Sequence, residues 1–388
     1  MNFELTEEQL IVLETASRFA QDYIAPYAAA FDEGRELDTY LANLKELGSL
    51  GFLSMGVSEA YGGSNLGTVA FSLVITELAK VCASTATAVS ATNMVAEVIQ
   101  AIGTEAQKGA YLPRFSSGEL AAASFCLSES EAGSDPSAMK TTATQCEEGW
   151  VLNGSKMWIS SAPYAGLFIV WAVTDKEADR GRGISCFVVE PNLPGIEVDQ
   201  PERKMGLNAS ATCRVTFDNC VIDKSALLGE LNNGYRIAVG ELCGGRIGIG
   251  SLALGLAKAA FDYAASYAAQ RQQFGQNIID FQGVQWMLAE AHGDLEATQL
   301  LINRAAWLKE LGRPFAVEAS VAKLKASEAA NEICSMAIQL CGGLGYTKDA
   351  PLERFARDAR VTTIYEGTSE VQKVIIGRDL VNRYSVSS

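Results

Sequence analysis

Three long segments with helical periodicity dominate the C-terminal part of this 388-residue chain. Alanine, leucine and isoleucine recur at helical spacing along residues 246–271, 280–311 and 315–340. Helices gain most of their stability by packing apolar faces together, because helical propensity alone contributes little. The segments therefore predict a helical bundle that runs from about residue 233 to the end of the chain.

Two different patterns precede this bundle. From Leu5 to about residue 121 the pattern is again helical, and Thr6 with Gln9 predicts a capping box at its start. Between about residues 122 and 232, short runs of β-branched and aromatic residues are typical of strands. The order predicts an α+β chain with three domains, at residues 1–121, 122–232 and 233–388.

Within the middle region we expect strands at residues 167–173, 184–189 and 213–217. Asn153-Gly154 separates two further strand-like runs and therefore predicts a hairpin turn.

The charge and the cysteines limit the possible partners and surroundings. A net charge of -15 argues against nucleic acid and anionic membranes as main partners. The first twenty residues lack the pattern of a signal or transit peptide, and no uncharged apolar run reaches the length of a membrane span. Nine scattered cysteines without a CxxC pair favour reduced thiols, so we expect a cytoplasmic protein.

His292 is the only histidine in the sequence. This argues against a histidine-based zinc site and against a Ser-His-Asp triad, and we expect no bound metal. An enzyme built from this chain must therefore use another acid–base group, and carboxylates are plentiful.

Glu366 is the carboxylate in the most suggestive position. Residues 362–365 are expected to be extended, while Ser369 and Gln372 predict a capping box at the start of a helix. Glu366 would then lie in the turn between them, where its side chain can point into a cleft. The alternative is a surface acid in a linker.

Two loop or strand motifs could contact a ligand. Residues 127–135 offer backbone N–H groups and hydroxyls to a polar ligand, or form an ordinary turn. In residues 156–161, Trp158 is followed by two serines that could hydrogen-bond a flat ring, although a core tryptophan is the common alternative.

Three motifs lie in or beside the predicted C-terminal helices. Arg271 ends one of them and could bind a phosphate, or only complement the helix dipole. The glycines of residues 339–346 are typical of a helix C-cap but also permit close approach of a ligand, and no strand precedes them as a Rossmann fingerprint requires. Arg246 follows two glycines near a helix start, where an ordinary surface arginine is the alternative.

In their order and separation, "SESEAGSD", "GSKMWISS", "RQQFGQ", "QLCGGLGY" and "RDARVTTIYEGTSE" resemble the acyl-CoA dehydrogenase family. The resemblance extends over essentially the whole chain. "GGRIGIGSLALGLAKAAFDYA" and "IYEGTSEVQ" are most similar to the short-chain, butyryl-CoA-type members.

The resemblance implies a fold, a cofactor and an activity. The expected fold is an N-terminal all-α domain, a middle β-barrel or β-sandwich and a C-terminal four-helix bundle, assembled as a homotetramer that binds FAD between the β domain and the bundle. The expected reaction is dehydrogenation of a short-chain, or branched, acyl-CoA to the trans-2-enoyl-CoA, with electrons passed to electron-transfer flavoprotein.

The resemblance also implies roles for individual residues. Glu366 matches the base that removes the α-proton, while hydride goes to flavin N5. The flavin-binding positions are Phe125, Leu127, Ser128, Gly133, Ser134, Trp158 and Ser160. The positions near the FAD phosphates and adenosine, or beside the catalytic turn, are Arg271, Gln273, Phe274, Gln282, Gln339, Gly342, Gly343, Thr368 and Glu370. The substrate positions are Ser134, Leu242, Cys243, Arg246, Tyr365 and Gly367.

Several positions depart from the usual family pattern. Ser130 and Glu131 replace Pro-Gly, and Cys243 replaces an acid that many members have three residues before Arg246. Glu97 lies on the helix that should line the acyl pocket, where it either faces inward and makes the pocket polar or faces solvent. The alternatives are an acyl group on a carrier protein, which the Cys243 departure favours, an oxidase, or a non-catalytic flavin-binding relative.

Overall fold

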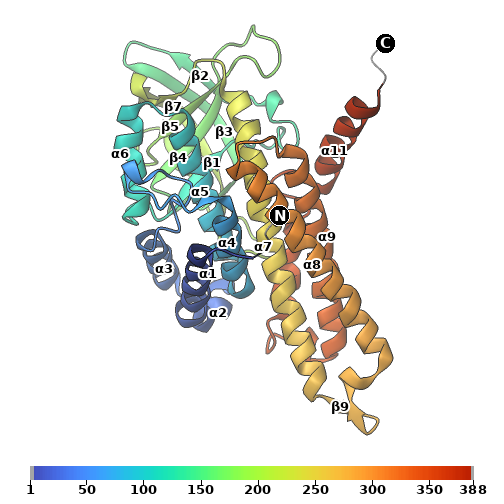
Figure 1. Cartoon of the computed structure of the whole chain (residues 1–388). Helices are drawn as coiled ribbons and strands as arrows, with labels where there is room; N and C mark the ends of the chain where they lie inside the picture. Colours follow the sequence, from blue (N-terminus) through green and yellow to red (C-terminus); the bar gives the residue numbers. More distant parts are fainter. Residues whose placement is uncertain (1–3, 386–388) are drawn as a thin grey trace.

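The computed structural model describes residues 4–385, in which the N-terminal helices pack against a C-terminal helical bundle and a sheet lies at one end of both (Figure 1). The N-terminal helices are α1 (Glu7–Phe19), α2 (Ala28–Asp32), α3 (Leu37–Ser49), α4 (Gly67–Val81), α5 (Ala83–Ile102) and α6 (Glu105–Ser116). The capping box of Thr6 and Gln9 at the start of α1 is confirmed. Helices α4 and α5 are buried on nearly every face, because they pack between the other N-terminal helices and the C-terminal bundle.

An eight-stranded sheet forms the middle region, with the strand order β6-β7-β3-β2-β4-β5-β8 and with β1 paired to β4. The strands are β1 (Ala123–Cys126), β2 (Thr142–Gln145), β3 (Gly149–Ser160), β4 (Leu167–Val173), β5 (Ile184–Val189), β6 (Ile196–Val198), β7 (Thr212–Asp223) and β8 (Leu227–Leu228). The strands expected at 167–173 and 184–189 are confirmed, and the one expected at 213–217 forms part of β7.

The hairpin expected at Asn153-Gly154 is wrong, because β3 continues through both residues. The register of β3 against β7 shifts there, between Leu152 and Gly154, so the pair marks a bulge and not a turn. Gly154 has a φ of 142°, and a Cβ at this position would lie 2.6 Å from the Cα of Thr141. Glycine is therefore needed for close backbone approach within the sheet.

The C-terminal bundle consists of α7 (Gly234–Gln270), α8 (Gln282–Glu310), α9 (Ala316–Cys341), α10 (Leu352–Val361) and α11 (Ser369–Tyr384). The three long segments predicted from periodicity are confirmed, although α7 begins well before residue 246. By length and composition α7 could cross a membrane, but it packs against α4, α5, α8 and α9, which explains its apolar sequence. A two-stranded ribbon, β9 (Gln272–Gln273) and β10 (Gln276–Asn277), lies at the tip of the bundle far from the sheet (Figure 1).

The segment between α10 and α11 differs from expectation. Residues 362–365 are not extended: Ile364 N and Tyr365 N both donate to Val361 O, at 2.8 and 3.1 Å, and so close turns at the end of α10. The Thr362 hydroxyl also donates to the carbonyl of Ala359, which favours the turn over an extended chain. The capping box predicted at Ser369 and Gln372 is wrong by one residue, because Ser369 is already the first residue of α11 and the N-cap is Thr368, whose hydroxyl accepts from Val371 N at 3.2 Å.

Candidate active site

Glu366 lies in the turn between α10 and α11, in a strained backbone conformation. Its φ is 53°, and the φ of Gly367 is 87°, so two successive residues are left-handed. A left-handed non-glycine residue costs about 1–3 kcal/mol and persists only where the surroundings fix it. Here the Gln372 amide donates to the carbonyls of Glu366 and Gly367, at 3.2 and 2.8 Å. The linker alternative is wrong, because the turn is locked in place.

The carboxylate of Glu366 points into the seam where α5 packs on α7. A Cβ placed on Gly245 of α7 would lie 2.8 Å from Glu366 Oε2 and 2.9 Å from the sulfur of Met94 on α5. One turn further along α7, a Cβ on Gly248 would meet Ser90 and would lie 3.2 Å from the ring of Phe71. The two glycines therefore leave room between the helices at the position of the carboxylate.

The electrostatic surroundings of Glu366 suit a base. The residue as a whole is half-buried, but its Oε2 atom is enclosed and has no hydrogen-bond partner among residues 4–385. Burial raises the pKa of this carboxyl to about 7, against the charges of Arg246 and Lys323, which lower it. A carboxylate with a pKa near neutrality and a free lone pair can accept a proton.

Arg246 is not a surface arginine, because it lies within α7 and is only 6% exposed. Its guanidinium donates to Cys243 Sγ at 3.5 Å and to Ser320 Oγ at 3.4 Å, while its Nε has no partner among the described residues. Cys243, which departs from the family pattern, thus still contacts this arginine.

Two other predicted substrate positions lie nearby in the sequence. Leu242 packs against the apolar cluster that includes the sheet, and the Tyr365 hydroxyl is buried without a partner in residues 4–385.

The predicted flavin positions of the sheet gather where β1 meets β3. Met157 N donates to Ser128 O at 2.9 Å, which joins the end of β1 to β3 beside Trp158. The register of β3 shifts between Lys156 and Ile159, and Trp158 itself has a φ of 64°. This irregularity leaves the indole 58% exposed, so the alternative of a core tryptophan is wrong.

The loop that follows β1 is built around a buried ion pair that sequence analysis missed. The Lys156 ammonium donates to Glu129 Oε1 at 2.8 Å, and the backbone N–H groups of Lys140 and Thr141 donate to the same carboxylate. The one available signal was Lys156, the only charged residue in the strand-like residues 154–161, because Glu129 is one of three acids in residues 127–135. Glu131, the unusual acid of this loop, is exposed and paired with Lys140.

Gly133 and Ser134 are exposed in the same loop, and the carbonyl of Ser160 accepts from the Ser124 hydroxyl. Phe125 packs against Trp171 with 4.2 Å between ring centroids and the rings tilted by 41°, and Leu127 is buried.

The remaining predicted FAD positions form two groups. Thr368 and Glu370 lie beside Glu366 at the start of α11. The others lie at the opposite end of the bundle from the sheet, where α7 and α9 end and α8 begins: Arg271, Gln273, Phe274, Gln282, Gln339, Gly342 and Gly343 (Figure 1). Phe274 is 94% exposed there, and Gly342 with a φ of 58° caps α9. A single chain does not bring this distal group to Trp158.

The groups around Trp158 fit a flavin. A large exposed indole is held out of the sheet by a backbone irregularity. Ser160 follows it two residues later, and the backbone of Ser128 is hydrogen-bonded to that of the preceding Met157. Exposed aromatic surface beside such donors is what a flat ring with polar edges requires.

Glu97 is neither an unpaired acid nor a free surface residue. It is paired with Lys309 of α8 at 2.6 Å, and each side chain is about a quarter exposed, at 24% and 25%. A Cβ on Gly244 would lie 3.0 Å from the Lys309 nitrogen, so the pair borders the seam next to Gly245. Glu241 lies one turn earlier on α7 and was also missed in the sequence. Burial and the charge of Glu97 raise its pKa to about 7, while the charge of Lys309 opposes this rise.

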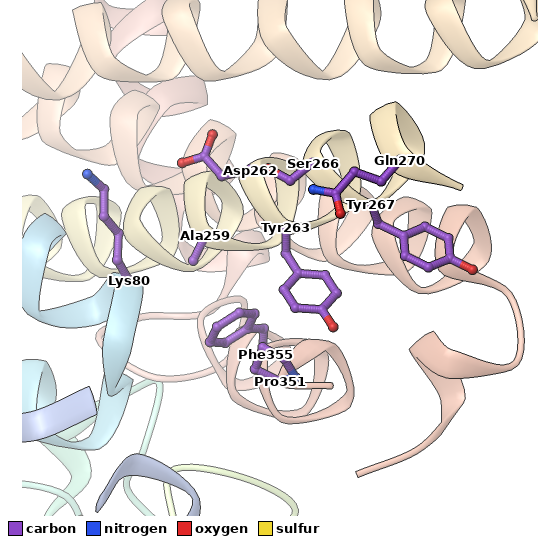
Figure 2. A pocket seen from close by; sticks show the side chains of 9 residues that line it. All are labelled: Lys80, Ala259, Asp262, Tyr263, Ser266, Tyr267, Gln270, Pro351 and Phe355. Atoms are coloured by element: carbon purple, nitrogen blue, oxygen red, sulfur yellow. The ribbon is translucent and has the colours of Figure 1, made fainter. Parts of the chain in front are cut away.

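A separate open groove of about 520 Å³ lies along the distal half of α7, away from Glu366 (Figure 2). Tyr263, Tyr267 and Phe355 line it together with Asp262 and Lys80. None of the predicted site residues contributes to this groove.

Comparisons with known proteins agree along the whole chain. Residues 6–119, 124–220 and 232–381 match the N-terminal, middle and C-terminal domains of acyl-CoA dehydrogenase, respectively. The chain is 42% identical over 380 residues to the short/branched chain specific acyl-CoA dehydrogenase of Bos taurus, covering 98% of this chain and 87% of that protein. It is 39% identical to the short-chain specific acyl-CoA dehydrogenase of Clostridium acetobutylicum, covering 97% of this chain and 98% of that one.

A solved structure of butyryl-CoA dehydrogenase from Megasphaera elsdenii superposes with a TM-score of 0.94 at 37% identity, covering 98% of this chain and all of the other. The predicted α+β fold and family are thereby confirmed. The chain belongs to the acyl-CoA dehydrogenase family and is an FAD-dependent oxidoreductase.

Proposed function

We propose that this enzyme dehydrogenates a short-chain acyl-CoA between the α- and β-carbons, with Glu366 as the base. One observation carries the proposal: Oε2 of Glu366 is enclosed, has no hydrogen-bond partner in residues 4–385, and points into a glycine-lined seam between α5 and α7. The activities for which the bovine, clostridial and Megasphaera relatives are named support a short acyl chain.

The residues of the seam give the carboxylate its function. The bond between the α-carbon and its hydrogen breaks, and the proton passes to the Glu366 carboxylate. Burial makes the carboxylate a stronger base than it would be in water, since its pKa is raised to about 7. Arg246 and Lys323 oppose this rise, so much of the carboxylate stays ionised at neutral pH. When bound, FAD supplies the acceptor for the hydride that leaves the β-carbon.

The same seam supports a limit on chain length. Towards Gly248 it is uncharged and closed by Phe71 and Ser90, while towards Gly244 it meets the ion pair of Glu97 and Lys309. An apolar acyl chain avoids desolvating a charged pair, so it would lie on the Gly248 side. Phe71, which is buried and lies against Gly248, would then limit the length of that chain.

Trp158, Ser128 and Ser160 would hold the flavin ring, and Thr368 with Glu370 would lie near it. The distal group at the bundle tip would reach the FAD of another copy, which supports a homotetramer. We further propose electron-transfer flavoprotein as the electron acceptor, and a cytoplasmic location, which the nine unpaired cysteines in residues 4–385 support.

Anaerobic titration of the FAD-loaded enzyme tests the proposal. Butyryl-, isobutyryl-, hexanoyl- and octanoyl-CoA are added separately while bleaching of the flavin absorbance is followed. We expect the four-carbon substrates to bleach the flavin fastest and Glu366→Gln to bind FAD but not to be bleached. Fastest reduction by octanoyl-CoA would contradict the proposed chain length, and a fully active Glu366→Gln enzyme would contradict the role of Glu366.

A carrier-bound substrate is the second candidate, because Cys243 replaces the acid that many relatives have. Bleaching by a butyryl carrier protein, and by none of the CoA thioesters, would favour it. Reduction of electron-transfer flavoprotein in preference to oxygen separates a dehydrogenase from an oxidase.

A further inference from the structure

Lys323 is a buried lysine to which the proposed reaction assigns no direct contact with the substrate. It lies within α9 and its side chain is fully buried. Its ammonium donates to the carbonyl of Gly367 at 2.8 Å, and it forms no ion pair within 4 Å in the described part of the chain. Burying an ammonium group without a paired carboxylate is costly, so its retention calls for a compensating role.

The carbonyl that Lys323 holds belongs to the strained turn. The amide of Gln372, also fully buried, donates to the same oxygen at 2.8 Å. One donor thus comes from α9 and the other from α11, and both donate to the carbonyl of Gly367, the residue that follows Glu366. Two buried donors on one carbonyl help to fix the two successive left-handed residues, since such residues persist only where the surroundings hold them.

We propose that Lys323 is a positioning residue for Glu366. Through the Gly367 carbonyl it fixes the turn that points the carboxylate at Gly245, and it places a positive charge on the buried side of that carboxylate. The inference rests on the proposed function, because it assumes that Glu366 is the base.

Two charged groups and one neutral titratable group lie around Glu366 and Lys323. Arg246 faces Glu366 from α7, and Glu370 of α11 faces Lys323, while the Tyr365 hydroxyl lies nearby. Burial lowers the pKa of Lys323 to about 8, and the charge of Glu366 counteracts this. Lys323 is therefore largely protonated at neutral pH, where its charge lowers the pKa of Glu366. Without that charge the pKa of Glu366 rises, and the acid limb of the pH–rate profile moves to higher pH. Arg246 remains and limits the displacement.

The test uses FAD-loaded Lys323→Gln, Lys323→Arg and Gln372→Met enzymes with butyryl-CoA. The amide of Lys323→Gln can still donate to Gly367 but carries no charge. We expect its acid limb to move upwards and its kcat/KM at pH 7 to fall by about fivefold, as a rise of one pKa unit from about 7 would produce, with partial recovery at higher pH. Lys323→Arg should restore the position of the limb. Gln372→Met should lower kcat without moving the limb, because it removes a neutral donor.

Lys258→Gln is the matched control, since this lysine of α7 hydrogen-bonds only to the side chain of Gln299 in the described residues and lies away from Glu366. It should leave the pH profile unchanged. A Lys323→Gln enzyme that retains FAD with the wild-type limb and rate would overturn the inference. If Lys323→Gln does not fold, the inference would be overturned by a Lys323→Arg enzyme whose acid limb is displaced from that of the wild type. An active Glu366→Gln enzyme would instead overturn the proposed function itself.

Discussion

Replacing the Glu366 carboxylate by an amide should abolish turnover and at the same time stabilise the protein. The pKa of this carboxyl is raised from 4.5 to about 7, chiefly by burial. The folded enzyme therefore holds the proton at pH values where the unfolded chain has already released it. Stability is lost as the pH rises from 4.5 to about 7, because the native state there binds more protons than the unfolded state.

The size of the effect follows from that interval. One pKa unit corresponds to about 1.4 kcal/mol, so the interval from 4.5 to about 7 corresponds to about 3 kcal/mol. Glu366→Gln has no carboxyl to titrate at this position. Its free energy of unfolding should exceed that of the wild type by an amount that approaches this figure above pH 7.5 and vanishes near pH 4.5. Urea unfolding of the two FAD-saturated enzymes across this pH range measures the difference.

Glu46→Gln is a suitable control, because Glu46 is exposed on α3. It should change neither stability nor its pH dependence. A Glu366→Gln enzyme with the same pH-dependent stability as the wild type would refute the reasoning, since it would mean that the carboxylate is not desolvated. An unchanged kcat would refute its role as a base, for which a loss of about 10²–10⁴-fold is expected.

Two further predictions concern geometry. Gly245→Ala should lower kcat/KM by about tenfold or more, because the added methyl displaces the tips of Glu366 and Met94. Its stability should stay the same, because alanine favours the helix. The control Gly240→Ala, which adds a methyl in open space on α7, should leave steady-state kinetics unchanged. Phe274→Ala should weaken FAD retention, measured by the flavin absorbance after gel filtration, if the exposed tip contacts the cofactor of another copy; equal retention would contradict that contact.

The long-range order of the fold could be predicted from periodicity because helices α7, α8 and α9 each carry a sustained apolar stripe. The errors fell where local and tertiary signals compete. Asn153-Gly154 is a strong turn signal by itself, yet the neighbouring strand β7 pairs on both sides of it and holds β3 continuous. Residues 362–365 looked extended because they are β-branched or aromatic, but two threonine hydroxyls bond back to the preceding helix.

The residues of the candidate site also fall into two groups, those that sequence motifs identify and those that only the fold reveals. Glu366 and Arg246 could be identified from motifs, since their sequence neighbours are distinctive. Lys323 and Glu241 could not, because each is one charged residue in a helix and only folding places it beside the seam. Such groups are recognised by burial without a local partner, which no periodicity reveals.

The ion pair of Glu97 and Lys309 decides whether the acyl pocket is polar, and the two ends of the seam can be tested separately. A methyl on Gly248 would approach Ser90 and lie 3.2 Å from Phe71, so Gly248→Ala should raise the KM for hexanoyl-CoA more than for butyryl-CoA. Glu97→Gln breaks a bridge of 2.6 Å and should lower stability, but the preference between the two substrates should stay the same, because the chain lies on the other side of Glu366. Measured specificity ratios that change with Glu97→Gln and not with Gly248→Ala would place the acyl chain beside the ion pair and reverse this assignment.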